Sequence, residues 1–114
     1  MNAILRFFVA PLLAATSVPA SEIGAVASYY ADHYEGKVMA NGKPFRQSRL
    51  TCASNYWPLG TKLRIRRYDR TVDVIVTDRM ARRFPTRIDL SQSAFRRLSP
   101  LTPGILIVGV TRLP

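Results

Sequence analysis

The 114-residue sequence has few of the side chains that build metal sites or histidine-activated nucleophiles. It contains one cysteine, Cys52, and one histidine, His33. A lone cysteine excludes an internal disulfide, and one residue of each type gives no cluster with zinc-ligand spacing. No Gly-x-Ser-x-Gly segment and no phosphate-binding glycine loop is present. We therefore expect no metal and no cofactor. We expect Cys52 as a buried apolar residue, with a free thiol or an intermolecular disulfide as the alternatives.

Acidic residues are also scarce, with 7 Asp and Glu against 17 Lys and Arg, so the formal net charge is +10. Such a basic chain favours a polyanionic partner, and a solvated basic surface is the alternative. The scarcity also leaves few carboxyl groups that could perform acid–base chemistry.

The first twenty residues have the pattern of a secretory signal peptide. Arg6 precedes an apolar run over residues 7–15, and Val18 and Ala20 occupy the small-residue positions before a cleavage point. The run is too short to span a bilayer, and a buried N-terminal helix or a retained anchor is the alternative. We expect residues 1–20 to be removed, leaving residues 21–114 as one exported domain in the periplasm or outside the cell.

Loss of Arg6, the one charged residue of that segment, lowers the net charge from +10 to +9. Outside the cytoplasm the nearest polyanions are cell-wall polymers and membrane surfaces rather than nucleic acid. We therefore expect a cell-wall glycan as the partner, no nucleic acid, and no stable membrane insertion. We also expect a monomer.

Two adjacent stretches have the alternation of β-strands. Leu63 and Ile65 alternate with charged residues within residues 61–68, and three valines alternate within residues 71–77. Asp69-Arg70 lies between these stretches and is short enough for a hairpin turn. The pattern predicts an antiparallel pair with one buried face.

Other stretches complete a mainly β domain. Residues 26–30 predict a strand, and residues 105–110, which are nearly all apolar, predict a strand buried on both faces. Residues 92–98 predict a short helix that either Ser91 or Asp89 caps, with Asp89 favoured as a capping residue over a catalytic one. A closed barrel suits this set of short strands, because closure removes exposed strand edges.

Asp78 is the best candidate for acid–base catalysis. It follows directly on the predicted strand 71–77, where a carboxyl can be held rigidly at the rim of a barrel. Burial there raises the pKa of a carboxyl and lets it act as a general acid near neutral pH. The alternative is an ion pair with the adjacent Arg79.

Several aromatic residues lie near the acidic residues in the sequence. They are candidates for sugar binding, because aromatic faces pack against the C–H faces of sugar rings. The alternative is ordinary packing in the core and at its rim. The best candidates are Tyr30, Tyr56 and Trp57.

Six short segments, in order, resemble the rare lipoprotein A family. They are Ala-Ser-Tyr-Tyr (27–30), Gly-Lys-Val-Met-Ala-Asn-Gly-Lys-Pro-Phe (36–45), Leu-Thr-Cys-Ala-Ser (50–54), Pro-Leu-Gly-Thr (58–61), Val-Thr-Asp-Arg (76–79) and Ile-Asp-Leu-Ser (88–91). The resemblance implies a six-stranded double-psi β-barrel with one or two short helices, related to expansins and barwin-like domains. It also implies a lytic transglycosylase that cuts MurNAc–GlcNAc bonds of peptidoglycan to 1,6-anhydro products. The family pattern makes Asp78 the catalytic carboxyl, first as acid and then as base.

Three departures from the family pattern bear on activity. Lys43 stands where active members usually have Glu, Ser54 where they have His, and Met80-Ala81 where they have Gly-Pro. If Lys43 lies near Asp78 it lowers the pKa of that carboxyl, which favours a non-catalytic glycan-binding module. If instead Ser54 forms a hydrogen bond with Asp78, the enzyme runs more slowly or on a different glycan.

A third hypothesis is an expansin-like effector that acts on other polysaccharides. Asp89, within Ile-Asp-Leu-Ser, is then the more important carboxyl, because expansins carry a functional Asp in the matching motif.

Overall fold

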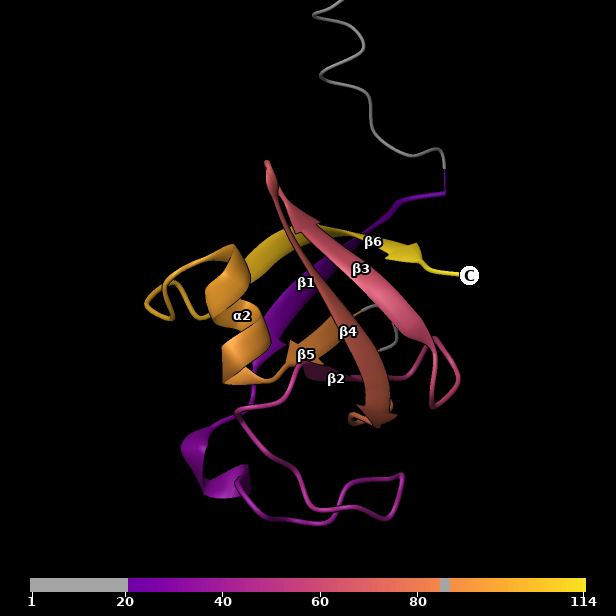
Figure 1. Ribbon diagram of the computed structural model, residues 1–114, viewed down its shortest axis with the longest axis vertical. Coiled ribbons are helices and arrows are strands. Elements are labelled where there is room, and N and C mark those ends of the chain that lie inside the picture. Colours follow the sequence, from indigo (N-terminus) through magenta and orange to yellow (C-terminus); the bar gives the residue numbers. More distant parts are fainter. Residues whose placement is uncertain (1–20, 85–86) are drawn as a thin grey trace, which may run out of the picture.

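The computed structural model describes residues 21–84 and 87–114, so the expected signal peptide lies outside the described residues. Six strands dominate this part of the chain (Figure 1). They are β1 (Ile23–Tyr29), β2 (Thr51–Ser54), β3 (Lys62–Arg67), β4 (Arg70–Asp78), β5 (Arg87–Leu90) and β6 (Leu106–Arg112). The mainly β class that the alternation predicted is confirmed.

The strands close into a barrel in the order β1-β5-β2-β4-β3-β6, and β6 pairs back to β1. The pairs β1–β5 and β2–β4 are parallel, whereas the other four are antiparallel. Parallel neighbours require long connections, so strands that are distant in sequence lie side by side. The six-stranded closed barrel that the alternation and the family resemblance implied is confirmed.

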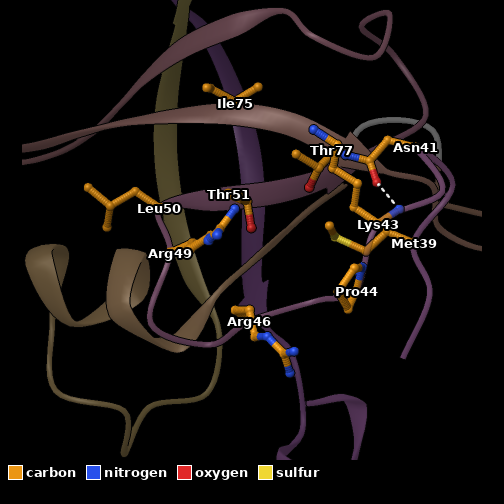
Figure 2. Close-up of a pocket in the computed structure, with 10 residues that line it drawn as sticks. All are labelled: Met39, Asn41, Lys43, Pro44, Arg46, Arg49, Leu50, Thr51, Ile75 and Thr77. Carbon is orange, nitrogen blue, oxygen red and sulfur yellow. Dashed lines mark hydrogen bonds between the residues drawn. The ribbon is translucent and has the colours of Figure 1, made fainter. Parts of the chain in front are cut away.

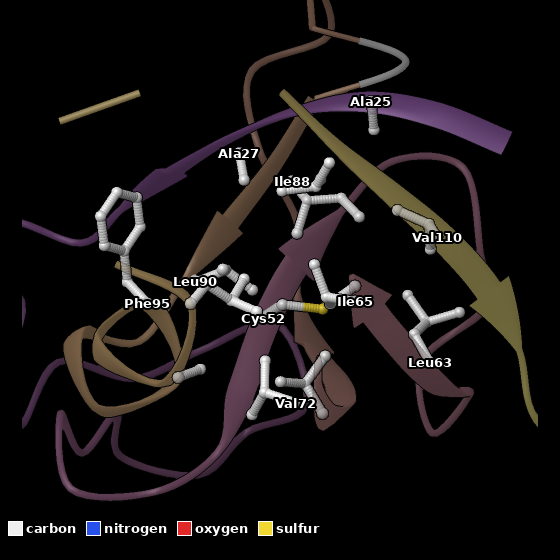
Figure 3. Close-up of a cluster of buried hydrophobic side chains, with 14 of the residues drawn as sticks. Ala25, Ala27, Cys52, Leu63, Ile65, Val72, Ile88, Leu90, Phe95 and Val110 are labelled. Carbon is white, nitrogen blue, oxygen red and sulfur yellow. The ribbon is translucent and has the colours of Figure 1, made fainter. Parts of the chain in front are cut away.

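Alternate side chains of the strands fill the barrel interior (Figure 3). Leu63 and Ile65 of β3 are buried, as are the three valines of β4, and the alternation predicted this. Cys52 lies in the same core with no exposed surface, and burial raises the pKa of its thiol to about 12. Its expected role as a small apolar residue is confirmed, and a thiol this deep cannot reach another chain.

The prediction that residues 105–110 form a strand buried on both faces was wrong. Ile105 and Ile107 are 52% and 75% exposed, while the side chains between and beyond them face the core. A strand in a closed barrel has only one face towards the interior. Its outer face is buried only where another element covers it, and an apolar composition does not reveal that cover.

The hairpin between β3 and β4 turns over Tyr68 and Asp69, one residue earlier than predicted. Arg70 already pairs with Arg67 in the strand ladder. Tyr68 has a φ of 55°, in the left-handed region that a tyrosine rarely adopts, so its residue type did not indicate that the turn includes it.

The predicted helix is α2 (Gln92–Leu98), which buries Ala94, Phe95 and Leu98 against the barrel. Ser91 caps it, because its Oγ accepts a hydrogen bond from the Ala94 N–H at 3.3 Å. The prediction that Asp89 serves as the cap was wrong, since Asp89 lies within β5. Among the described residues, no helix combines the length and apolarity needed to cross a membrane.

The long connection between β1 and β2 packs against the end of β4. It begins with the 3-10 helix η1 (Asp32–Tyr34) and lies below the barrel in Figure 1. Its backbone reaches β4 at Asn41, whose N–H donates to the Thr77 carbonyl at 3.2 Å. Phe45, 1% exposed, anchors the returning chain. The connection therefore forms part of the surface around the end of β4.

Candidate functional site

Asp78 and Asp89 lie in one cleft at the end of the barrel, here called the carboxyl cleft. Strand register explains why the two aspartates lie in the same cleft, because Ala53 of β2 pairs with Asp78 of β4 on one side and with Asp89 of β5 on the other. The Cα atoms of the two aspartates are thus two strand spacings apart, about 10 Å. The cleft has a volume of about 280 Å³ and is lined by Tyr30, Tyr34, Ala53, Asp78, Arg79, Met80, Ala81, Phe84 and Asp89.

Three hydrogen-bond donors orient the Asp78 carboxyl. The Tyr30 hydroxyl donates to Oδ2 at 2.7 Å, and the backbone N–H groups of Ala40 and Arg79 donate to Oδ1 at 2.8 and 2.9 Å. Tyr30 is itself fixed, because its ring stacks on Phe45 with centroids 4.0 Å apart. Burial, and then the bond to Asp78, raise the pKa of Tyr30, so its hydroxyl keeps the proton that it donates.

Asp89 has a different environment. Burial raises the pKa of its carboxyl to about 6, opposed by a hydrogen bond from Ser28 and by the charge of Arg87, and reinforced by the charge of Asp78. The Ser28 hydroxyl donates to Oδ1 at 3.1 Å. Asp89 therefore holds a proton closer to neutral pH than an ordinary aspartate does.

The alternative of an ion pair between Arg79 and Asp78 was wrong. The Arg79 guanidinium turns away from the carboxyl, and its Nη1 donates to the carbonyls of Ser54 and Trp57 at 2.7 and 2.6 Å. Only the backbone N–H of Arg79 contacts Asp78. Arg79 thus ties the end of β4 to the loop after β2, which leaves the carboxyl of Asp78 facing the cleft.

The hypothesis that Ser54 donates a hydrogen bond to Asp78 was also wrong. Ser54 is fully buried, and its Oγ accepts hydrogen bonds from the N–H groups of Tyr56 and Trp57 at 3.0 and 3.5 Å. It shapes the turn after β2. The carboxyl cleft is instead lined by Ala53, which precedes it.

Lys43 lines a second cleft (Figure 2), and it is not among the residues that line the carboxyl cleft. We call this one the basic cleft; it has a volume of about 390 Å³ and is lined by Met39, Asn41, Lys43, Pro44, Arg46, Arg49, Leu50, Thr51, Ile75 and Thr77. The turn that carries Ala40 and Asn41 lies between the two clefts, because Ala40 contacts Asp78 and Asn41 contacts Thr77. Among the described residues no ion pair joins Lys43 to Asp78.

The three aromatic candidates for sugar binding separate. Tyr30 is only 5% exposed, so it positions Asp78 and presents no face to a sugar, against the prediction. Tyr56 is 62% exposed, and its ring packs edge to face against the half-buried Trp57, with ring centroids 4.6 Å apart. This pair borders a smaller hollow beside the start of β1 and does not line the carboxyl cleft.

Comparison with known proteins decides the family. A family model described as lytic transglycolase matches residues 23–110, which is most of the described chain. The chain belongs to this lytic transglycolase family. The resemblance to rare lipoprotein A is confirmed with it, since two proteins named probable endolytic peptidoglycan transglycosylase RlpA are 33% identical to the chain.

Relatives of this lytic transglycolase domain differ greatly in length. An uncharacterized Synechocystis protein, ssl3177, is 37% identical over 76% of the chain and 94% of its own length. The RlpA proteins of Synechocystis and Treponema pallidum match over 72% and 74% of the chain, but the chain spans only 26% and 27% of theirs.

Solved structures share the barrel of the lytic transglycolase domain. The Streptomyces papain inhibitor superposes with a TM-score of 0.70 at 26% identity, over 86% of this chain and all of that one. A Clavibacter michiganensis expansin in complex with cellohexaose superposes with a TM-score of 0.67 at 23% identity, over 82% of this chain and 50% of that one. The second likeness shows the fold alone.

Sequence reasoning missed several residues of the carboxyl cleft in this lytic transglycolase domain. Ser28 lies on β1 and donates a hydrogen bond to Asp89. Its position within the Ala-Ser-Tyr-Tyr segment was the one indication of a role in the sequence. Ala40 contributes a backbone N–H, which no side-chain pattern reveals. Phe84 lines the cleft, and its ring lies under the guanidinium groups of Arg83 and Arg87, at 4.8 and 4.7 Å.

Proposed function

We propose that this chain cleaves peptidoglycan glycan strands as a lytic transglycosylase. The observation that carries the proposal is the pair of carboxyls, Asp78 and Asp89, on either side of Ala53 in one open cleft. Three donors orient Asp78, whereas burial raises the pKa of Asp89 to about 6. A carboxyl that holds a proton closer to neutral pH, with a second carboxyl in the same cleft, suits acid–base cleavage of a glycosidic bond.

Each carboxyl has one role in the proposed reaction. Asp89 is the acid, and it protonates the glycosidic oxygen as the bond from that oxygen to the anomeric carbon breaks. Asp78 is the base, and it takes the proton of the muramyl 6-hydroxyl as this oxygen bonds to the same carbon. The products are a 1,6-anhydro sugar and a free hydroxyl, without consumption of water. Exchange with solvent then returns the two carboxyls to their starting protonation states.

We also propose that residues 1–20 direct export and that the domain acts in the periplasm or outside the cell. The signal-peptide pattern supports this location, as does the similarity to proteins named peptidoglycan transglycosylases. Mass spectrometry of the protein from its own cells should find a chain that begins at Ser21.

The activity is tested on peptide-free glycan strands, with mass spectrometry of the products. We expect anhydro-muramyl ends with the wild-type protein and none with Asp78→Asn or Asp89→Asn. Asp73→Asn is the matched control, because Asp73 lies on the same strand but points outward to Arg64, 2.8 Å away. Absence of product from the wild type, under conditions where an active family member works, would reject the proposal.

A second candidate function is glycan binding without cleavage, which the basic cleft favours. Lys43, Arg46 and Arg49 border it, and none of its lining residues is acidic. Pull-down with purified sacculi should then retain Asp78→Asn as well as the wild type, with retention that falls as salt rises. Equal, salt-dependent retention with no product from either protein would favour this function over cleavage.

A further inference from the structure

The basic cleft concentrates positive charge beside the carboxyl cleft. Figure 2 shows Lys43, Arg46 and Arg49 around it, on the connection between β1 and β2. The opposite wall consists of Ile75 and Thr77, at the end of β4. A hollow of about 390 Å³ is large enough for part of a sugar and its substituent.

Two of the three cations are available for a ligand. Arg46 is 3.3 Å from Glu35, so its charge is partly neutralised. Within residues 21–84 and 87–114, no ion pair involves Lys43 or Arg49. An incoming anion would therefore meet two uncompensated charges, and no carboxylate in the lining would repel it.

The wall of the cleft also holds an unused polar group. The hydroxyl oxygen of Thr77 is buried and has no hydrogen-bond partner among the described residues. Leaving such a group unpaired is unfavourable.

The two clefts lie close enough to serve one chain of sugars. Thr77 borders the basic cleft and Asp78, the next residue, borders the carboxyl cleft. The turn between the clefts contacts both residues through backbone N–H groups, Asn41 to the Thr77 carbonyl and Ala40 to Asp78. A strand held at Asp78 can thus place a neighbouring substituent in the basic cleft.

We propose that the basic cleft is a subsite for a carboxylate substituent of the glycan, bound by Lys43 and Arg49. This inference rests on the proposed function, because it assumes that the carboxyl cleft holds a glycan strand. The carboxylate is that of the lactyl ether on a muramyl sugar or, on strands that keep their peptides, one from the peptide. The subsite makes the protein selective for acidic glycans over neutral ones of the same backbone.

The test compares two oligosaccharides of equal length that differ in the lactyl carboxylates. One is a peptide-free muramyl strand, and the other is a neutral N-acetylglucosamine oligomer. Calorimetry on the purified Asp78→Asn variant, in which cleavage does not complicate binding, should give a Kd about fivefold lower for the muramyl strand, as expected for partly exposed ion pairs. A strand with intact peptides, whose lactyl carboxylates are in amide bonds, tests the second source: equal preference shows that a peptide carboxylate can also occupy the subsite, and lost preference restricts the subsite to the lactyl carboxylate.

Variants separate the subsite from the overall charge. In the same background, Lys43→Gln with Arg49→Gln should abolish the preference and leave the affinity for the neutral oligomer unchanged. Arg70→Gln with Arg96→Gln is the matched control, because it removes the same charge from a hollow at the far end of β4. This control should keep the preference.

Three results would overturn the subsite: equal affinity of the parent for both oligosaccharides, a preference that survives the Lys43 and Arg49 changes, or an equal loss in the control. None of them bears on cleavage, which is measured separately with protein that retains Asp78. If the protein cuts muramyl strands but does not prefer them, the subsite is refuted and the proposed cleavage stands. If it prefers muramyl strands but does not cut them, the subsite stands and the proposed cleavage is refuted.

Discussion

At the scale of single residues, the two aspartates differ in what surrounds them. Asp78 accepts hydrogen bonds from two backbone N–H groups and a tyrosine, while Asp89 accepts one from Ser28. Burial disfavours the charged form of Asp89 and raises its pKa. The same residue type is thereby prepared for two roles within one cleft.

The titration of Asp89 tests this difference directly. We expect its carboxyl ¹³C signal to titrate with a midpoint of about 6. Ser28→Ala should raise the midpoint, because it removes a bond that favours the ionised form, and Asp78→Asn should lower it, because it removes a nearby negative charge. A midpoint near 3.8, the ordinary value, would contradict this description of the site.

The same shift affects stability in a fixed direction. The pKa of Asp89 is higher in the folded protein than in the unfolded chain, so folding favours the protonated form. The contribution of Asp89 to the free energy of unfolding should fall by about 2 kcal/mol as pH rises from about 4 to about 6. Denaturant titrations of wild type and Asp89→Asn at both pH values should show this difference, and parallel pH profiles would contradict it.

Tyr30 is a positioning residue whose hydroxyl can be removed alone. Tyr30→Phe keeps the ring on Phe45 and deletes the hydrogen bond to Asp78. We expect stability to change by only about 1 kcal/mol, and the cleavage rate to fall roughly tenfold. Thermal melting and product formation measure the two effects. An unchanged rate would mean that the two backbone donors suffice to orient Asp78.

At the scale of elements, an ion pair fastens the start of β1 across β6 to β3. Glu22, just before β1, accepts hydrogen bonds from the Arg66 guanidinium at 2.6 and 2.8 Å. Its side chain lies over Gly109 of β6, where an added Cβ would collide with the Glu22 carboxyl group. Gly109 is therefore glycine because Glu22 occupies the space above it.

This arrangement predicts non-additive substitutions. Gly109→Ala should push the Glu22 side chain off Arg66, and Glu22→Gln should remove the charge, so each should lower the free energy of unfolding. The double variant should cost little more than either single one, as chemical denaturation can measure. Full additivity would show that Gly109→Ala acts in another way.

The pH dependence of this contact runs opposite to that of Asp89. The hydrogen bond from Arg66 holds the pKa of Glu22 below its usual 4.5. The contact therefore stabilises the fold above about pH 4.5 and is lost as pH falls through the lowered value.

The sequence predicted elements well where a strand has one buried face, as in β3 and β4, because alternation records that face directly. It failed for residues 105–110, because an apolar outer face gives the same signal as a buried one. The site was predictable in part. Asp78 stands out as the end of a strand, but the meeting with Asp89 depends on both strands pairing with Ala53. The positions of Lys43 and Ser54 stayed open in the sequence, because a loop path and a side-chain direction decide them.

At the scale of the whole molecule, the barrel has the carboxyl cleft and the basic cleft at one end and a further basic surface at the other. The carboxyl and basic clefts adjoin where β4 ends, and a hollow lined by Arg67, Arg70 and Arg96 lies where β4 begins. The net charge is +9 once Arg6 is lost with residues 1–20. In the proposed account, Lys43 and Arg49 contribute to it at the subsite, and the other basic residues add a general attraction for acidic polymers. Only binding at the subsite depends on the positions of individual residues.

The central claim is that Asp78 and Asp89 together cleave a glycan. Its most direct test is the rate of anhydro-muramyl end formation on peptide-free strands between pH 4 and pH 8. We predict a rate that decreases as pH rises above about 6, where Asp89 loses its proton, and no product at any pH with Asp78→Asn. Product formation that persists in Asp78→Asn, or a wild-type protein without product across the whole range, would contradict the claim.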